Sequence, residues 1–192
     1  MRKTVLASLL ALSIASVAQA APIAFGTVLS GLNENPPNAS PGTGVALVFY
    51  DPVAHTLQVN AVFADLIGNT TASHIHCCTT PNLNAGVATQ TPSFPGFPLG
   101  VTAGVYNSAV FDLTLAASWN AAFIAANGGS PATAEAAFAA GLVNGLTYFN
   151  IHTNVFPGGE IRGQLAAVPE PATLALLGLG LSGLAMRRRV RR

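Results

Sequence analysis

Two neighbouring runs decide the fold of this chain: TYFNIHT at residues 147–153 and EIRGQLA at residues 160–166. Apolar and polar side chains alternate in each run, and a period of two is typical of a β-strand with one buried face. Phe-Pro-Gly-Gly at residues 156–159 separates the runs and predicts a turn. We therefore expect two neighbouring strands that place Ile151 and Ile161 in the core.

The same reading extends outward along the chain. Five more short strands are expected, at residues 23–32, 44–50, 55–64, 70–77 and 107–116. Residues 33–38 form a turn-rich stretch, and residues 81–104, with four prolines and four glycines, form a long loop. Within residues 70–77, Ile75 is expected to point into the core.

Two alanine-rich segments interrupt the strands, at residues 118–126 and 131–143. Ser118 and Ser130 stand where helix N-caps lie, and Pro131 suits a first helical position. We read these segments as a short two-helix insertion. The predicted fold class is mainly β, an antiparallel β-sandwich or barrel that carries this insertion.

The beginning of the chain is predicted to be a signal peptide. Residues 1–20 begin with Arg2 and Lys3, continue with an apolar stretch and end in a small-x-small cleavage pattern. Signal peptidase is expected to cut after Ala20. The chain is therefore directed out of the cytoplasm.

The end of the chain, residues 168–192, is a second sorting segment. It contains Pro169-Glu170-Pro171, an apolar run at residues 172–186 and five arginines after it. A helix over that run would be about 22 Å long, short of the roughly 30 Å of a bilayer core, and the arginines would hold its end on the cytoplasmic side. An ordinary single-span anchor would have the same orientation.

This tail resembles the PEP-CTERM sorting signal of Gram-negative bacteria. The resemblance implies that the tail is a transient membrane anchor and that an exosortase-type membrane peptidase cuts near Pro169, Glu170 and Pro171. It also implies passage through the periplasm and inner membrane to the cell surface or exterior.

Residues 21–167 form the remaining domain, which is one domain in size. It holds a single basic residue, Arg162, against six acidic residues and has a net charge near −5. Nucleic acid is therefore not an expected partner, because phosphate binding needs clustered cations.

The only two cysteines, Cys77 and Cys78, are adjacent. An exported chain meets an oxidising compartment, so a vicinal disulfide is favoured over metal ligation. Pairing with another chain is a further alternative. A thiol nucleophile paired with a histidine is disfavoured, since no other feature suggests acyl transfer.

The polar members of three expected strands form one group. His74 and His76 oppose Ile75, His152 lies on the polar face of its strand, and Glu160 and Arg162 oppose Ile161. All are expected to point away from the apolar core.

Two interpretations of this group stay open. His74, His76 and His152 are candidate ligands for copper or zinc, with Glu160 or Cys77 as a fourth ligand. Alternatively, the group is a structural network in which the imidazoles donate to carbonyls, and Glu160 and Arg162 pair with each other or with the histidine-bearing strands.

The domain resembles the CHRD domain, named after chordin, over nearly its whole length. The resemblance rests on LSGLNENPP at residues 29–37, ASHIH at 72–76, YFNIHT at 148–153 and FPGGEIRG at 156–163. It implies an immunoglobulin-like β-sandwich of poorly defined molecular function. The family usually has Gly-Pro where this chain has Cys77-Cys78. A fainter likeness, to the copper/zinc superoxide dismutase sandwich, is one of fold alone, because this chain lacks the further histidines and the aspartate of that zinc site.

The sequence therefore predicts an exported, non-enzymatic domain sorted to the cell surface or extracellular matrix. One alternative is a copper- or zinc-binding, redox-competent protein. Another is a self-associating matrix or adhesion module, with extracellular polysaccharide as a candidate partner.

Overall fold

The computed structural model describes residues 21–169 and residue 180. The expected signal peptide, with its cleavage site at Ala20, and the tail segment with Glu170 and Pro171 lie outside the described residues. The strands are β1 (Ile23–Ser30), β2 (Thr43–Asp51), β3 (Thr56–Ala64), β4 (Thr70–Cys77), β5 (Gly104–Asn107), β6 (Phe111–Asp112), β7 (Thr147–Thr153), β8 (Ile161–Gln164) and β9 (Ala166–Ala167). The helices are α1 (Ala121–Ala126), α2 (Pro131–Val143) and the 3₁₀ turns η1 (Gly31–Asn33) and η2 (Ala116–Ser118). The mainly β class with a two-helix insertion is confirmed.

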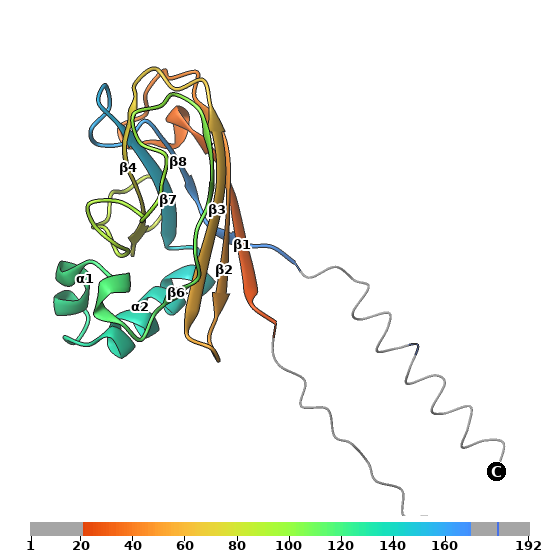
Figure 1. Ribbon diagram of the computed structural model, residues 1–192, viewed down its shortest axis with the longest axis vertical. Coiled ribbons are helices and arrows are strands. Elements are labelled where there is room, and N and C mark those ends of the chain that lie inside the picture. The colour runs from red at the N-terminus through yellow and green to blue at the C-terminus, as the bar shows by residue number, and fades with distance from the viewer. Residues whose placement is uncertain (1–20, 170–179, 181–192) are drawn as a thin grey trace, which may run out of the picture.

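The strands form one antiparallel sheet in the order β4-β7-β8-β1-β2-β3-β5. The sheet curls over so that β4, β7 and β8 lie against the layer of β1, β2 and β3, as in a sandwich or half-barrel (Figure 1). Phe94 bridges the two sides, because its ring stacks on Phe149 of β7 and on Tyr106 of β5. One hydrophobic core therefore fills the curl.

The period-two alternation is confirmed on the core side. Ile75, Ile151 and Ile161 are fully buried within this core. The opposite face of β4, β7 and β8 is largely buried as well, because η1 and parts of the loop before β5, at Ala85 and Pro92, contact its side chains. His76 and Arg162 on that face are only 7% and 3% exposed.

The expected strand over residues 107–116 is wrong in extent. β5 ends at Asn107 and β6 holds only two residues. Ser108 explains the break: its hydroxyl accepts from the Val59 backbone N–H and donates to the Ala109 carbonyl. A side chain therefore takes a position that a backbone carbonyl would hold in a regular ladder.

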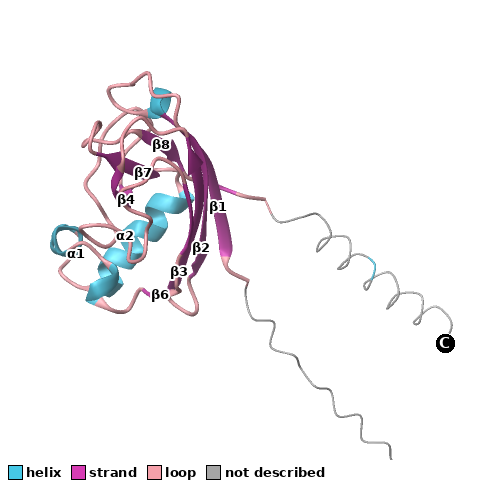
Figure 2. Cartoon of the chain, turned by 45° about the horizontal axis from the view of Figure 1, so that its top comes forward, coloured by secondary structure: helices cyan, strands magenta, loops and turns pink. Residues whose placement is uncertain are grey.

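The helices close one end of the curled sheet (Figure 2). Ser130 caps α2 through a capping box with Thr133, and Pro131 begins the helix, as expected. Ser118 is not the cap of α1, because Asn120 accepts from the Ala122 N–H instead. None of the helices in the described part of the chain has the length and hydropathy for a bilayer crossing.

Candidate metal centre

Three histidines meet on the covered face of β4 and β7. His74 and His76 are two residues apart on β4 and share a face, and the strand register pairs Ala72 with His152 and His74 with Asn150. The three ring centroids lie 5.2 to 5.8 Å apart. Two neighbouring strands therefore bring together the three histidines that the sequence proposes as ligands.

A backbone carbonyl fixes the orientation of each ring. His74 Nε2 lies 2.7 Å from the Pro92 oxygen, His76 Nδ1 lies 2.9 Å from the Ala85 oxygen, and His152 Nδ1 lies 2.9 Å from the Pro157 oxygen. A carbonyl can only accept, so each of these ring nitrogens carries the proton and donates. The other nitrogen of each ring then presents a lone pair.

Those other nitrogens are the unusual feature of the site. His74 Nδ1, His76 Nε2 and His152 Nε2 are buried and have no hydrogen-bond partner. One nitrogen from each ring lies within 4.8 Å of the nitrogens of the other two. Metal-binding histidines have this arrangement, in which one nitrogen donates to a carbonyl and the other ligates the ion.

The environment keeps the three rings neutral. Burial, with a smaller contribution from the neighbouring His152, lowers the pKa of His74 to about 4. Burial also lowers the pKa of His76 to about 4 and lowers the pKa of His152. Neutral imidazole is the form that binds a metal, so the site is ready to ligate at neutral pH.

Tyr148 and Arg162 support one side of the cluster. The His76 ring stacks on the Tyr148 ring, and the Arg162 guanidinium lies 4.6 Å from the centre of the Tyr148 ring. The Tyr148 hydroxyl accepts from the Ala85 N–H, the residue whose carbonyl holds His76. The loop above the site is thus tied to the strand below it.

The expected pair of Glu160 and Arg162 does not form. Arg162 Nε lies 3.8 Å from the carboxylate of Glu34, donates to the Asn33 carbonyl at 2.5 Å, and sends Nη1 to Asn84. The sequence analysis did not identify Glu34 as the partner of Arg162, although Glu34 lies within residues 29–37, a stretch that resembles the CHRD domain.

Glu160 is fully buried and occupied elsewhere, so it is not placed as a fourth ligand. Its carboxylate accepts from the hydroxyls of Ser40 and Thr153 and from the backbone N–H groups of Ile67 and Gly68. Burial alone would raise its pKa, but these four donors outweigh burial and hold the pKa of Glu160 below its usual range. The sequence also allowed Glu160 to pair with a histidine-bearing strand instead of with Arg162. Glu160 does so, because Thr153 belongs to β7, the strand that bears His152.

A disulfide joins Cys77 to Cys78. Cys77 is part of the hydrophobic core on the same face of β4 as Ile75, so it points away from His76 and is not available as a ligand. α2 passes close to the two sulfurs at Gly141, where a Cβ atom would lie 2.6 Å from Sγ of Cys77. The cysteine pair therefore packs against the helical end of the domain.

A family model for the CHRD domain matches residues 25–165. The chain belongs to the CHRD family. A second model, for the PEP-CTERM protein-sorting motif, matches residues 167–189. No curated protein and no solved structure matches the chain.

The sorting motif makes this CHRD protein an exported, surface-sorted protein and a substrate of exosortase-type machinery. The CHRD family is not a known enzyme family. The apolar helix expected in the tail belongs to the sorting motif.

The four sequence blocks that resemble the CHRD domain converge on one place. The first supplies Glu34, the second His74 and His76, the third His152 with Tyr148, and the fourth Arg162. The contacts above join them into one buried polar assembly. The fold thus gathers the most recognisable stretches of a CHRD sequence around the candidate metal centre.

Proposed function

We propose that the exported CHRD domain is a non-enzymatic binding module that holds copper or zinc at the cell surface through His74, His76 and His152. Two observations support this proposal: each ring has one buried nitrogen without a hydrogen-bond partner, and one nitrogen from each ring lies within 4.8 Å of one from the other two. An unsatisfied buried acceptor costs roughly 1–3 kcal/mol. A bound ion would satisfy all three at once.

The distances suit an imidazole-bound metal ion. Zinc–nitrogen bonds of about 2.1 Å place three nitrogens about 3.5 Å apart around one ion. The nitrogens here lie within 4.8 Å of one another, so small side-chain rotations close the set. Three imidazoles favour copper or zinc over magnesium or calcium, which prefer oxygen ligands.

A binding role is favoured over a catalytic one because the site is enclosed. His74 and His76 are 6% and 7% exposed, beneath the loops that hold Pro92 and Ala85. A substrate would have to displace those loops. The CHRD domain is also not a known enzyme family, so membership suggests no reaction.

Elemental analysis of the exported protein, before and after chelator, tests metal binding. We expect about one copper or zinc ion per chain. The melting temperature should fall on chelation and recover when the ion is added back. An ion concentration of about 100 times the dissociation constant would stabilise the folded state by about 2.7 kcal/mol. His152→Gln should abolish both effects. His55→Gln is the matched control, because His55 is exposed and bonds Glu135 instead. A melting temperature of the parent that ignores both ions would refute the proposal.

We also propose that the mature chain begins at residue 21 and loses its tail near Pro169. This is supported by the exposure of β9 and Val168, which lie where the sorting motif begins, after the last core strand. A cut there removes no core strand. Intact-mass measurement of the surface fraction should find no species that retains residues 187–192; such a species would contradict the processing.

A further inference from the structure

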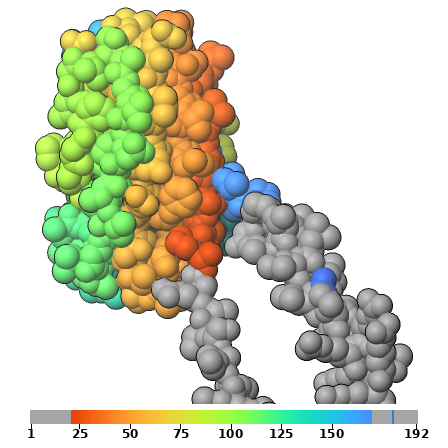
Figure 3. Space-filling view, turned by 45° about the vertical axis from the view of Figure 1, so that its right-hand side comes forward, coloured from red at the N-terminus to blue at the C-terminus, as the bar shows by residue number. Residues whose placement is uncertain are grey.

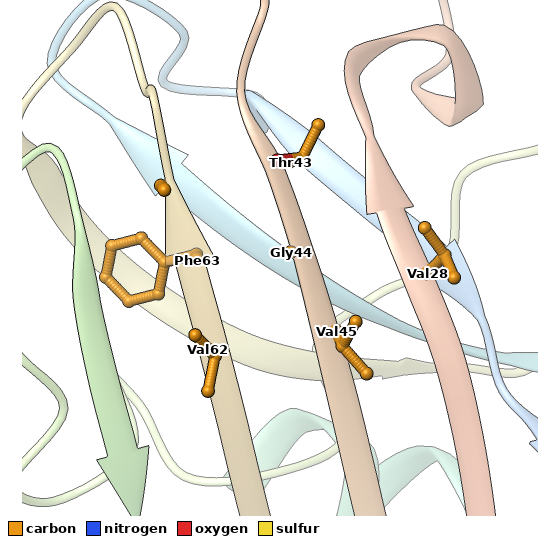
Figure 4. Close-up of a pocket in the computed structure, with 7 residues that line it drawn as sticks. Val28, Thr43, Gly44, Val45, Val62 and Phe63 are labelled. Atoms are coloured by element: carbon orange, nitrogen blue, oxygen red, sulfur yellow. The ribbon is translucent and has the colours of Figure 1, made fainter.

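The outer face of the other half of the sheet carries a straight row of valines. The strand register places Val28 opposite Val45, Val45 opposite Val62, and Val62 opposite Val105. Directly opposed residues lie on the same face of a sheet. Figure 4 shows three of these valines side by side on neighbouring strands. We call Val28, Val45, Val62 and Val105 the valine row.

The valine row is open to solvent. Its members are 50–66% exposed. The outer face of β1, β2 and β3 around the valine row forms a broad open surface (Figure 3), and Val168 lies against it at Gly26, beside Leu47. Single exposed apolar residues are ordinary on a protein surface, whereas an aligned apolar group of this kind marks an interaction site.

A partly exposed leucine and a hollow lie on opposite sides of the valine row. Leu47, two residues beyond Val45 on β2, is 37% exposed. On the other side, a hollow of about 320 Å³ is bordered by Thr43 and Ala64 together with three valines of the row. The face therefore carries an apolar side chain on one side of the row and a hollow on the other.

The charge of the domain suggests which partner fits. The residues in register on either side of the valine row are uncharged: Ser30, Thr43 and Ala64 on one side, and Gly26, Leu47, Asn60 and Asn107 on the other. The rest of the domain has one arginine against six acidic residues. Two copies would repel one another through most of their surfaces, but can meet here without like-charge contact.

We propose that the valine row binds a second copy of this chain, face to face. A two-fold axis along the row would set each valine against the same valine of the other copy. The same rotation exchanges the two sides of the row, so that Leu47 of each copy enters the hollow beside Thr43 of the other. An isologous dimer needs this self-complementarity, and stacked sheets pack about 10 Å apart through such side chains.

The contact is small, so the dimer is weak. Four strands about 4.8 Å apart give a face narrower than a standard interface, which buries about 800 Å² on each partner. We expect a dissociation constant between about 1 μM and 1 mM. Sorting of many copies to one surface would raise their local concentration and favour pairing.

Sedimentation equilibrium of the purified exported protein tests the proposal. The parent should show concentration-dependent dimers. Val45→Lys and Val45→Glu should each remain monomeric, and an equimolar mixture of the two should associate, because Val45 faces its own counterpart across the axis. Leu47→Ala should weaken the dimer about tenfold through lost apolar burial.

Val143→Lys is the matched control, since Val143 is a 70% exposed valine at the end of α2, away from this face. It should dimerise like the parent, and all variants should keep the parent's melting temperature at concentrations where the parent is monomeric. The proposal is wrong if the parent stays monomeric at millimolar concentration, if Val143→Lys disrupts the dimer as much as Val45→Lys, or if the mixture stays monomeric. Binding of monomers to lipid vesicles or polysaccharide that Val45→Lys abolishes would also overturn it. The metal site plays no part in this test.

Discussion

The imidazole of His76 lies flat against the phenol ring of Tyr148, with 4.7 Å between centroids and 5° between planes. In the sheet, β7 lies between β4 and β8, so the Tyr148 ring connects the histidine cluster to Arg162 on its other side. Arg162 in turn compensates the buried carboxylate of Glu34. The histidine cluster and the ion pair are therefore one packed assembly.

Arg162→Ala should destabilise the domain by about 3–5 kcal/mol, because it leaves a buried carboxylate without its cation. Glu34 is 6% exposed and burial raises its pKa to about 7. The loss should therefore be larger at pH 8, where Glu34 must ionise, than at pH 5, where it is protonated. Urea unfolding at both pH values measures this. Glu34→Gln in the Arg162→Ala background should recover part of the loss, and an unchanged midpoint for Arg162→Ala would refute the role.

Glu160→Gln should cost stability at neutral pH, since an amide cannot accept from Ser40, Thr153 and two backbone N–H groups at once. The pKa of Glu160 is lowered, so its contribution is full above the ordinary value near 4.5 and is lost as pH falls through the lowered value. Parent and variant should therefore converge in strong acid. A constant difference between their unfolding free energies from pH 7 to pH 2 would contradict this assignment.

Ile151→Ala should cost about 2–5 kcal/mol, the range for a fully buried isoleucine. Ile151 has no exposed surface and lies in the core between the two halves of the curled sheet. Val155→Ala, at a half-exposed valine in the turn after β7, is the control and should change little. Denaturant titration distinguishes the two, and equal effects would show that the register is wrong.

The local alternation of apolar and polar residues was enough to predict the strands and the histidine cluster. Ile151 and His152 take opposite faces because alternation is a property of neighbouring residues. The pairing of Arg162 with Glu34 could not be read in the same way, since 128 residues separate them and only the curl of the sheet brings them together. Glu160 was the nearer carboxylate in sequence, but three of the four donors that hold it, at Ser40, Ile67 and Gly68, come from distant loops.

Backbone groups form much of the part of the site that could not be predicted from the sequence. The carbonyls of Pro92, Ala85 and Pro157 orient the imidazoles, and every residue has such a carbonyl, so no residue type identifies them. The cover over His74 and His76 was missed for the same reason. Residues 81–104 were expected to be a loop, but composition does not show what a loop packs against.

Metal-free protein should become less stable as pH falls from about 6.5 towards 4. Burial lowers the pKa of His74 and His76 to about 4, whereas unfolded histidine titrates near 6.5. Between these values the unfolded chain binds more protons than the folded one, so acid favours unfolding. Glu34 acts in the opposite direction, because its raised pKa of about 7 lets the folded state bind a proton first.

A Glu34→Gln background removes that opposing contribution and isolates the histidines. In this background, with chelator present, the urea midpoint should fall steadily from pH 7 to pH 5. His74→Gln should make the decline shallower, because one buried imidazole no longer resists protonation. Added zinc should steepen the decline, since protonated imidazole cannot bind the ion. A midpoint that is flat from pH 7 to pH 5 would mean that the three rings are not held neutral by the fold.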